Sequence, residues 1–270
     1  YRFGYFISYV LMIAVSLVGR EVNGKKRWLG VGSFSFQPTE VVKITLIVYL
    51  AVLITKMGSE INDWKKVMKV GLLRALPIAA IVGANNLSSG IIIVGIAFVM
   101  LFIASRHKVL FYAGGIAAAV VVAIAGPLAI LLEKIKVLKP YQLSRIHVWL
   151  SPEAYPMDGG YQVLQGLYAI GSGGLFGKGL GESIQKMGFV PEAQNDMIFS
   201  IICEELGFFG ALCVIMIFLF LISRFVLIAN NAPDLLGALI VVGVMAHIAI
   251  QVILNIAVVT NTIPNTGITL

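Results

Sequence analysis

The residues that could carry chemistry are gathered in one polar, glycine-rich stretch, residues 159–196, within a chain that is otherwise strongly apolar. This stretch ends at Asp196, directly before the apolar run 197–223, so the sequence predicts a carboxylate at the boundary between water and lipid. A carboxylate in that position can accept a proton from a reacting hydroxyl group. Glu204 and Glu205 lie about two turns further on, where an ionised side chain must face a cavity or pair with a cation. The alternative for these two is structural, as buried carboxylates that hold helices together through ion pairs and hydrogen bonds.

The glycines of this stretch do not form a nucleotide-binding loop. A phosphate-binding loop requires Gly, four further residues and then Gly-Lys-Ser or Gly-Lys-Thr. Here Gly177 and Lys178 are followed by Gly179, and Ser172 stands where the first glycine is needed. The three histidines are scattered along the sequence, so a zinc site is not expected either. The glycines instead predict a backbone that comes close to a ligand or to a neighbouring helix.

A second polar stretch, residues 20–40, combines basic residues with a tryptophan and leads into an apolar run. The basic residues are suited to bind a phosphate, and the tryptophan is suited to stack on a sugar or a lipid. The alternatives are that Trp28 is an aromatic anchor at the membrane surface and that Glu40 and Lys43 neutralise each other on one helix. The candidate binding residues of this stretch are Lys25, Lys26, Arg27, Trp28, Gln37, Glu40 and Lys43.

The composition indicates an integral membrane protein. Of the 270 residues 59% are hydrophobic and 12% are charged, and the mean hydropathy is +0.95, outside the range of a globular protein with a hydrated surface. The net charge of +7 is typical of basic cytoplasmic loops and not of a nucleic-acid-binding surface. Apolar runs suited to cross a bilayer predict seven helices, at residues 5–18, 41–57, 71–84, 90–104, 109–132, 197–223 and 235–260.

The short loops predict how these helices are oriented. If consecutive helices alternate sides, one side collects most of the basic residues and should be cytoplasmic. These residues are Lys56, Lys65, Lys66, Lys69, Arg74, Arg106, Lys108 and Arg224. The segment 133–196 then forms a large extracytoplasmic loop within a single membrane domain, residues 1–270. An exception on the outer side is the group Arg20, Lys25, Lys26 and Arg27, which we interpret as cations retained there to bind an anion.

Motifs in both polar stretches relate the chain to one family over essentially its whole length. The matching positions are 24, 27–28, 37–40, 43, 160–162, 171–175, 177, 179, 181, 183, 185–186, 191–192, 196, 199, 204–207, 210, 255, 264 and 266–267. In these positions the chain resembles the SEDS polysaccharide polymerases, the group of FtsW, RodA and SpoVE. The segment 179–186, which reads Gly-Leu-Gly-x-Ser-x-Gln-Lys, is more similar to the division and sporulation members than to the rod-elongation ones.

The resemblance implies an all-α polytopic bundle of about ten helices, two of them before Tyr1 and one after Leu270, so that this chain is a fragment lacking both ends. It also implies an enzyme of the bacterial cytoplasmic membrane, a peptidoglycan glycosyltransferase that polymerises lipid II into glycan strands on the outer face in cell division or sporulation. Asp196 would be the essential catalytic residue, with Trp28 beside it. The implied partners are lipid II, a class B penicillin-binding protein acting as transpeptidase, other divisome or sporulation proteins and membrane lipids, but no nucleic acid.

The chemistry of such a polymerase sets the demands on the remaining residues. Outside the cell the sugar donor must arrive already activated, and a lipid diphosphate is both leaving group and membrane anchor. The enzyme then needs a base for the acceptor hydroxyl, a role that suits Asp196, and positive charge for the departing diphosphate. That charge can come from basic residues of either polar stretch or from a divalent cation such as Mg or Mn, and no cofactor is certain. Further candidates for substrate binding are Tyr161, Gln162, Lys178, Gln185, Lys186, Glu192, Glu204 and Glu205.

Departures from the family pattern and two other functions stay open. Thr39 replaces the usual serine, which is a mild change, whereas Asn86 stands where the family commonly has an acid, so the role of that acid is an open question in this chain. A flippase for lipid-linked precursors is one alternative function, because intramembrane charges such as Glu40, Lys43 and Glu204 could line a cavity that opens to both sides in turn. A non-catalytic scaffold of a cell-wall synthesis complex is the other.

Overall fold

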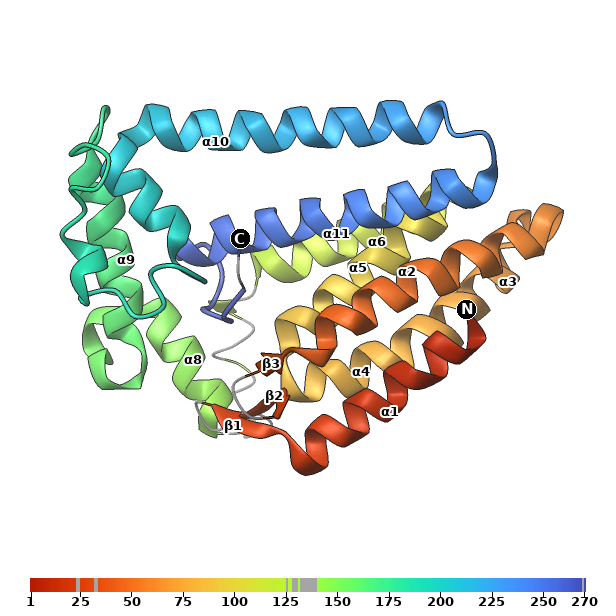
Figure 1. Ribbon diagram of the computed structural model, residues 1–270, viewed down its shortest axis with the longest axis horizontal. Coiled ribbons are helices and arrows are strands. Elements are labelled where there is room, and N and C mark those ends of the chain that lie inside the picture. Colours follow the sequence, from red (N-terminus) through yellow and green to blue (C-terminus); the bar gives the residue numbers. More distant parts are fainter. Residues whose placement is uncertain (23–24, 32–33, 125, 128–130, 132–139, 269) are drawn as a thin grey trace. The chain divides into compact units, whose positions relative to one another are not determined.

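The computed structural model describes residues 1–22, 25–31, 34–124, 126–127, 131, 140–268 and 270, and most of this part of the chain is helical (Figure 1). The helices are α1 (Arg2–Val18), α2 (Pro38–Met57), α3 (Trp64–Val70), α4 (Leu76–Asn85), α5 (Leu87–Ala104), α6 (Val109–Ala123), α8 (Pro140–Leu150), α9 (Gly160–Gly173), α10 (Ile198–Asn230) and α11 (Leu235–Val259). Shorter helical turns are η1 (Gly58–Asn62), η2 (Gly71–Ala75), η3 (Pro152–Ala154), η4 (Pro156–Asp158) and η5 (Gln185–Met187). The fold class predicted from the sequence is confirmed.

The described residues contain five helices that are long and apolar enough to cross a membrane. They cover Pro38–Asn62, Trp64–Asn85, Leu87–Ala104, Ile198–Asn230 and Leu235–Val259, and two shorter apolar helices cover Arg2–Val18 and Val109–Val121. These correspond to the seven predicted segments, and the chain is a multi-pass membrane protein. The third segment begins earlier than predicted because the π-helical turn η2 joins α3 to α4. The predicted end of the fifth segment, residue 132, lies outside the described residues.

By its internal contacts the chain divides into two compact units. The first comprises Tyr1–Phe111 with Leu221–Ile250, and the second Tyr112–Phe220 with Gln251–Leu270. In the first unit α1, α2, α4 and α5 pack around fully buried side chains such as Leu46 and Ile93. The first part of α11 joins them where Gly243 lies against Ile47 and Met100, since small residues let membrane helices approach closely. Both units contain parts of α10 and α11, and the single membrane domain expected from the sequence stays a prediction.

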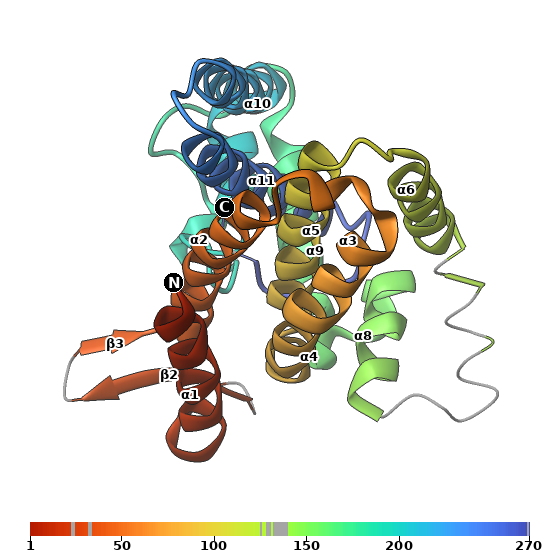
Figure 2. The ribbon, with the colours of Figure 1, turned by 90° about the vertical axis from the view of Figure 1, so that its right-hand side faces the viewer.

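The polar stretch after α1 is not an irregular loop as expected. It contains β1 (Arg20–Val22), β2 (Lys25–Val31) and β3 (Phe34–Phe36), which form an antiparallel sheet in the order β1-β2-β3. Figure 2 shows the strands beside one end of α1, within the first unit. Pairing between strands gives the backbone amides and carbonyls partners near a membrane, where an unpaired polar group is costly. Alternation of polar and apolar residues is weak here, which explains why the sequence did not predict the strands.

The polar stretch 159–196 is also more ordered than predicted, because its first third is the helix α9. The buried residues of α9 include Gly160, Val163, Gly166, Ala169 and Gly173, which lie on one face at intervals of three or four residues. In the sequence these glycines indicated a loop. In the structure they form a smooth helix face instead: a side chain on Gly173 would collide with a carbonyl group of α10, that of Cys203.

The second unit has an apolar core beneath the loop that precedes α10. This core comprises Val190, Met197, Phe199, Ile201, Cys203, Ala211 and Val259. It places the start of α10 and the end of α11 against the loop, so the loop that carries Asp196 is supported on its apolar side. The candidate catalytic residue is thus positioned by α9, by the start of α10 and by the segment around the end of α11.

Candidate functional site

Helix α10 is broken at Gly207, whose backbone angles (φ 68°, ψ −165°) are not helical. A break of this kind frees amide and carbonyl groups that would otherwise bond along the helix, and within a membrane these groups need other partners. The glycine-rich loop after α9 supplies them. The backbone hydrogen bonds across the break run from Lys178 N to Glu204 O (2.9 Å), Gly179 N to Glu205 O (2.9 Å), Phe208 N to Gly174 O (2.9 Å) and Phe209 N to Leu175 O (3.2 Å).

Two glycines make this insertion of the loop into the helix possible. Gly177 has a φ of +79°, and a Cβ atom there would lie 2.1 Å from the carbonyl oxygen of Glu205. A Cβ atom on Gly207 would in turn lie 2.3 Å from the amide nitrogen of Gly177. Both positions combine a left-handed backbone with direct contact between two main chains, and only glycine satisfies both conditions. The expectation that the glycines mark a close approach to a neighbouring helix is confirmed.

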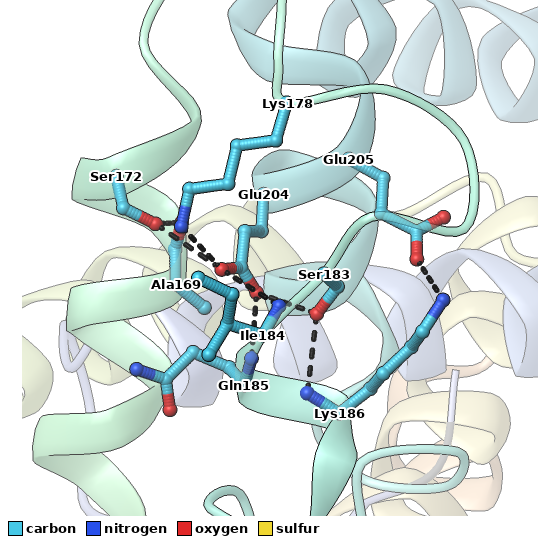
Figure 3. Close-up of polar contacts among 9 residues, drawn as sticks. All are labelled: Ala169, Ser172, Lys178, Ser183, Ile184, Gln185, Lys186, Glu204 and Glu205. Carbon is cyan, nitrogen blue, oxygen red and sulfur yellow. Dashed lines mark hydrogen bonds and ion pairs between the residues drawn. The ribbon is translucent and has the colours of Figure 1, made fainter.

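The carboxylate of Glu204 organises the side-chain contacts of this loop (Figure 3). The side chain is fully buried, and a buried carboxylate requires a cation and hydrogen-bond donors. Its donors are Lys178 Nζ (2.7 Å), Ser183 Oγ (2.5 Å), Gln185 N (3.2 Å), Ile184 N (3.3 Å) and Ser172 Oγ (3.4 Å). This arrangement favours the structural interpretation of Glu204 over substrate binding, because the carboxylate is enclosed by the loop and holds it to α10.

Glu205 forms a second ion pair beside the first. The ammonium group of Lys186 lies 2.6 Å from its carboxylate, and both side chains are partly exposed. The amide of Lys186 also donates to Ser183 Oγ (3.1 Å), so the two ion pairs are connected through one serine. The structure thus brings Lys178, Lys186, Glu204 and Glu205 together, and it pairs each lysine with a glutamate.

The loop that leads to Asp196 is a compact turn. Glu192 is exposed and has a φ of +55°, an unusual conformation for a residue with a side chain. Its carbonyl accepts from the amides of Asn195 (3.0 Å) and Met197 (3.3 Å), and its carboxylate accepts from Asn195 Nδ2 (2.7 Å). Asp196 follows this turn, is partly exposed and stands two residues before the start of α10. The structure places this carboxylate just before an apolar helix, and its position at the boundary between water and lipid stays a prediction.

A pocket of about 500 Å³ lies beside this turn. Its lining consists of the polar residues Lys186, Glu192 and Gln194 and the apolar residues Val190, Ala193, Ile198 and Ile201. Polar and apolar groups contribute equally to this lining, so the pocket can contact both kinds of surface on a ligand. Asp196 is not among the lining residues, but it follows Gln194 by two positions in the same turn.

Side-chain amides hold both ends of the turn that carries Asp196. At its start, Gln162 of α9 donates to the carbonyl of Pro191 (3.3 Å) and accepts from Asn265 (3.0 Å). At its end, Asn255 of α11 donates to the carbonyl of Asp196 (2.9 Å). The sequence indicated Gln162 as a substrate-binding residue, whereas the structure shows it bonded within the protein. The sequence did not indicate Asn265, and it indicated Asn255 as a position that matches the family.

The other predicted binding residues of the second unit have different surroundings. Tyr161 is exposed at the start of α9, next to Gln162. Gln185 contributes its backbone amide to Glu204 and its carbonyl to Val190 N (2.9 Å). Neither residue lines the pocket beside the turn.

The predicted binding residues near the amino terminus belong to the first unit. Trp28 lies on β2 opposite Arg20 and is 37% exposed, which is compatible with stacking on a ligand and with a membrane anchor. Gln37 immediately precedes α2, and Glu40 pairs with Lys43 at 2.8 Å, as its spacing predicted. Lys43 is buried, so this pair lies at the edge of the helix core. The predicted proximity of Trp28 to Asp196 stays a prediction, since the two belong to different units.

The remaining basic residues, Lys25, Lys26 and Arg27, are placed by their backbone on β2. Asn86 is buried between the end of α4 and the start of α5. Within the described ranges, no group of three His, Cys, Asp or Glu side chains is arranged to hold a metal ion.

Comparison with known proteins agrees with this architecture. The family of cell cycle proteins that comprises FtsW, RodA and SpoVE matches residues 1–270. The stage V sporulation protein E of Bacillus subtilis (strain 168) is 39% identical over 271 residues, covering 98% of this chain and 70% of that protein. A probable peptidoglycan glycosyltransferase FtsW of Coxiella burnetii is 34% identical over 272 residues, covering 98% of this chain and 70% of that protein.

Solved structures show the same fold. A chain of a peptidoglycan synthase complex that coordinates polymerization and crosslinking superposes with a TM-score of 0.75 at 26% identity, covering 99% of this chain and 72% of that one. The rod shape determining protein RodA of Thermus thermophilus gives a TM-score of 0.64 at 23% identity, covering 98% of this chain and 68% of that one. The chain therefore belongs to the family of FtsW, RodA and SpoVE cell cycle proteins.

Proposed function

We propose that this chain is the membrane-embedded part of a peptidoglycan glycosyltransferase that polymerises lipid II in cell division or sporulation. Its relatives of that name match it over 98% of its length, which is the observation that carries the proposal. The second unit supplies a suitable site, because a partly exposed carboxylate follows a turn that lines a mixed polar and apolar pocket. We assign Asp196 as the catalytic base in this site.

The reaction joins an acceptor sugar to a donor sugar that is linked to a lipid diphosphate. The acceptor hydroxyl gives its proton to the Asp196 carboxylate while its oxygen forms a bond with the anomeric carbon of the donor. The bond between that carbon and the phosphate oxygen breaks, and the lipid diphosphate leaves with the electron pair. A positioned base of this kind contributes roughly two to four orders of magnitude in rate.

The departing diphosphate needs positive charge, and the ion pairs of the second unit narrow the choice of residues. Lys178 is bound to Glu204 and Lys186 to Glu205, so the charge of each lysine is already neutralised. From their residue types, we propose that Lys25, Lys26 and Arg27 bind the diphosphate and that Trp28 stacks on the substrate. A divalent cation stays an alternative source of charge.

The polar residues of the pocket suit the sugar part of the substrate. Glu192 and Gln194 offer a carboxylate and an amide next to an apolar lining formed by residues such as Ile198. Hydroxyl and acetamido groups of the sugar can form hydrogen bonds with this carboxylate and this amide, while the sugar ring packs on the apolar lining. The site would face outward, and a class B penicillin-binding protein would cross-link the strands that it releases.

The experiment that tests this function compares strand formation from lipid II by purified full-length protein and by its Asp196→Asn variant. Asparagine caps a helix about as well as aspartate but cannot accept the proton, so the variant should fold normally and form no strands. Glu192→Gln is the matched control and should be milder, since Glu192 is not the base. Normal polymerisation by Asp196→Asn would exclude Asp196 as the base and reopen Glu40 and Glu205 as candidates. Transport of lipid II without strand formation would identify a flippase instead.

A further inference from the structure

Asn255 of α11 ties together two segments that are distant in sequence. Its side chain is fully buried, and its amide nitrogen donates to the carbonyl of Asp196 (2.9 Å) and to the carbonyl of Ile268 (2.6 Å). An amide nitrogen carries two hydrogens, so these bonds use its whole capacity as a donor. One side chain thus fixes the main chain of the proposed base to the segment that follows α11.

A second link holds the other end of the same turn. Asn265 donates to the side-chain carbonyl of Gln162 (3.0 Å), and Gln162 donates to the main-chain carbonyl of Pro191 (3.3 Å). The segment 265–268 is therefore bonded to both ends of the turn 191–196, through Gln162 at the start and through Asn255 at the end. All of these residues belong to the second unit.

The conformation of the turn shows that it depends on such support. Glu192 has a positive φ of 55°, and a residue with a side chain persists there only where surrounding contacts outweigh the cost. The bond between the side chains of Asn195 and Glu192 is local and exposed, so it cannot orient the turn relative to the helices. The bonds from Asn255 and Gln162 can do so, because both residues are on helices.

We propose that Asn255 is a positioning residue for Asp196, and that Gln162 and Asn265 support the opposite end of the turn. This inference rests on the proposed function, in which Asp196 is the base. The carboxylate must stand close to the acceptor hydroxyl, and a displacement of about 1 Å can lower a rate about 100-fold. Without Asn255 the carbonyl of Asp196 loses the hydrogen bond from α11, so this end of the turn is held less firmly relative to that helix.

The experiment measures kcat and KM for lipid II polymerisation by the purified full-length protein, its Asn255→Ala variant and a matched control. Asn255→Ala should lower kcat about 10- to 100-fold and leave KM within about twofold, since the turn moves while the substrate-binding groups remain. The control is Asn261→Gly. Asn261 lies just after α11, and its side chain also donates to a main-chain carbonyl, that of Trp149 (3.2 Å). Glycine keeps the positive φ of 54° at this position, and this variant should retain the kcat of the parent.

Asp196→Asn is measured in parallel, so that failure of this inference and failure of the proposed function can be told apart. Normal polymerisation by Asp196→Asn would overturn the function itself. If Asp196→Asn is inactive while folded Asn255→Ala keeps the parental kcat, only the positioning role is overturned. It is also overturned if kcat falls merely in step with the fraction of folded protein, as read from thermal unfolding. If Asn255→Ala does not fold, Asn265→Ala decides between the same outcomes, because it removes the support at the other end of the turn.

Discussion

At the scale of single residues, the carboxylates of the second unit have different surroundings and therefore suit different tasks. Glu204 is fully buried and surrounded by donors from the glycine-rich loop. Its carboxylate therefore binds that loop to α10. Asp196 is partly exposed at the end of a turn, two positions after Gln194, which lines a pocket. The sequence singled out Asp196 as the base and left Glu204 open between substrate binding and a structural role, and burial favours the structural role for Glu204.

The structural role of Glu204 leads to a prediction about stability. Glu204→Ala leaves the ammonium group of Lys178 and two backbone amides without their acceptor. Loss of one partner of a buried ion pair costs about 3–5 kcal/mol, and we expect about 2–3 kcal/mol here, because Lys178 is partly exposed and can be rehydrated. The thermal unfolding midpoint should fall, and the loop 174–185 should become sensitive to protease.

The matched control for this prediction is Glu182→Ala, which removes an exposed glutamate from the same loop. It should change the unfolding midpoint little, as is usual for surface substitutions. Combining Glu204→Ala with Lys178→Ala should recover part of the loss, since no unpaired charge remains. Equal stability of the Glu204→Ala and Glu182→Ala variants would argue against the structural role.

At the scale of elements, the central feature is a loop built into a broken helix. The stretch 174–179 completes the hydrogen bonding of α10 on both sides of Gly207. Backbone hydrogen bonds therefore hold this loop, which follows α9, to α10. This explains how an irregular backbone is tolerated at the end of a membrane helix. It also explains why lysines and glutamates from these two elements meet as ion pairs.

Substitution of Gly177 tests this arrangement. Gly177→Ala would place a methyl group against the carbonyl of Glu205 and force a left-handed conformation on alanine. We expect the free energy of unfolding to fall by about 1–3 kcal/mol and the polymerisation activity to be lost. Gly171→Ala is the control, because a Cβ atom there has no neighbour within 4 Å and alanine favours a helix. Unfolding midpoints of both variants in detergent, with strand formation from lipid II, measure the effect. If Gly177→Ala is as stable and active as Gly171→Ala, the loop does not need this close contact.

At the scale of the whole molecule, the chain is a multi-pass membrane protein whose orientation is still a prediction. The basic residues after α2 and after α5, among them Lys65 and Arg106, indicate the cytoplasmic side. The loop between α9 and α10 would then face outward. A site on that side needs a donor that arrives already activated, such as a lipid diphosphate, so the predicted orientation and the proposed chemistry agree.

Labelling of single cysteines tests the orientation. In a Cys213→Ser background, Glu182→Cys should react with a membrane-impermeant thiol reagent in intact cells, whereas Ser59→Cys should react only after the membrane is permeabilised. Both positions are exposed, and the other native cysteine, Cys203, is buried. The opposite labelling pattern would place the proposed site in the cytoplasm and contradict the outward assignment.

The sequence by itself determined the membrane class, the apolar helices and the family, because composition and apolar runs are local properties and the motifs are dense. It also predicted the pairing of Glu40 with Lys43, since residues three apart on a helix are neighbours. It could not distinguish glycines of a loop from glycines of a packed helix face, and so it missed α9. Nor did it predict the strands after α1.

Only the tertiary structure decided what the polar residues do, because their partners are distant in the sequence. Glu204 meets Lys178 across 26 positions, and Asn255 meets the carbonyl of Asp196 across 59. Such contacts depend on how α9, α10 and α11 pack, which in turn depends on glycines that admit a neighbouring backbone. The sequence left the role of Glu204 open, because a carboxylate within an apolar run can face a cavity or be enclosed by protein, and it is the packing of the loop against α10 that encloses Glu204 while Asp196 stays partly exposed.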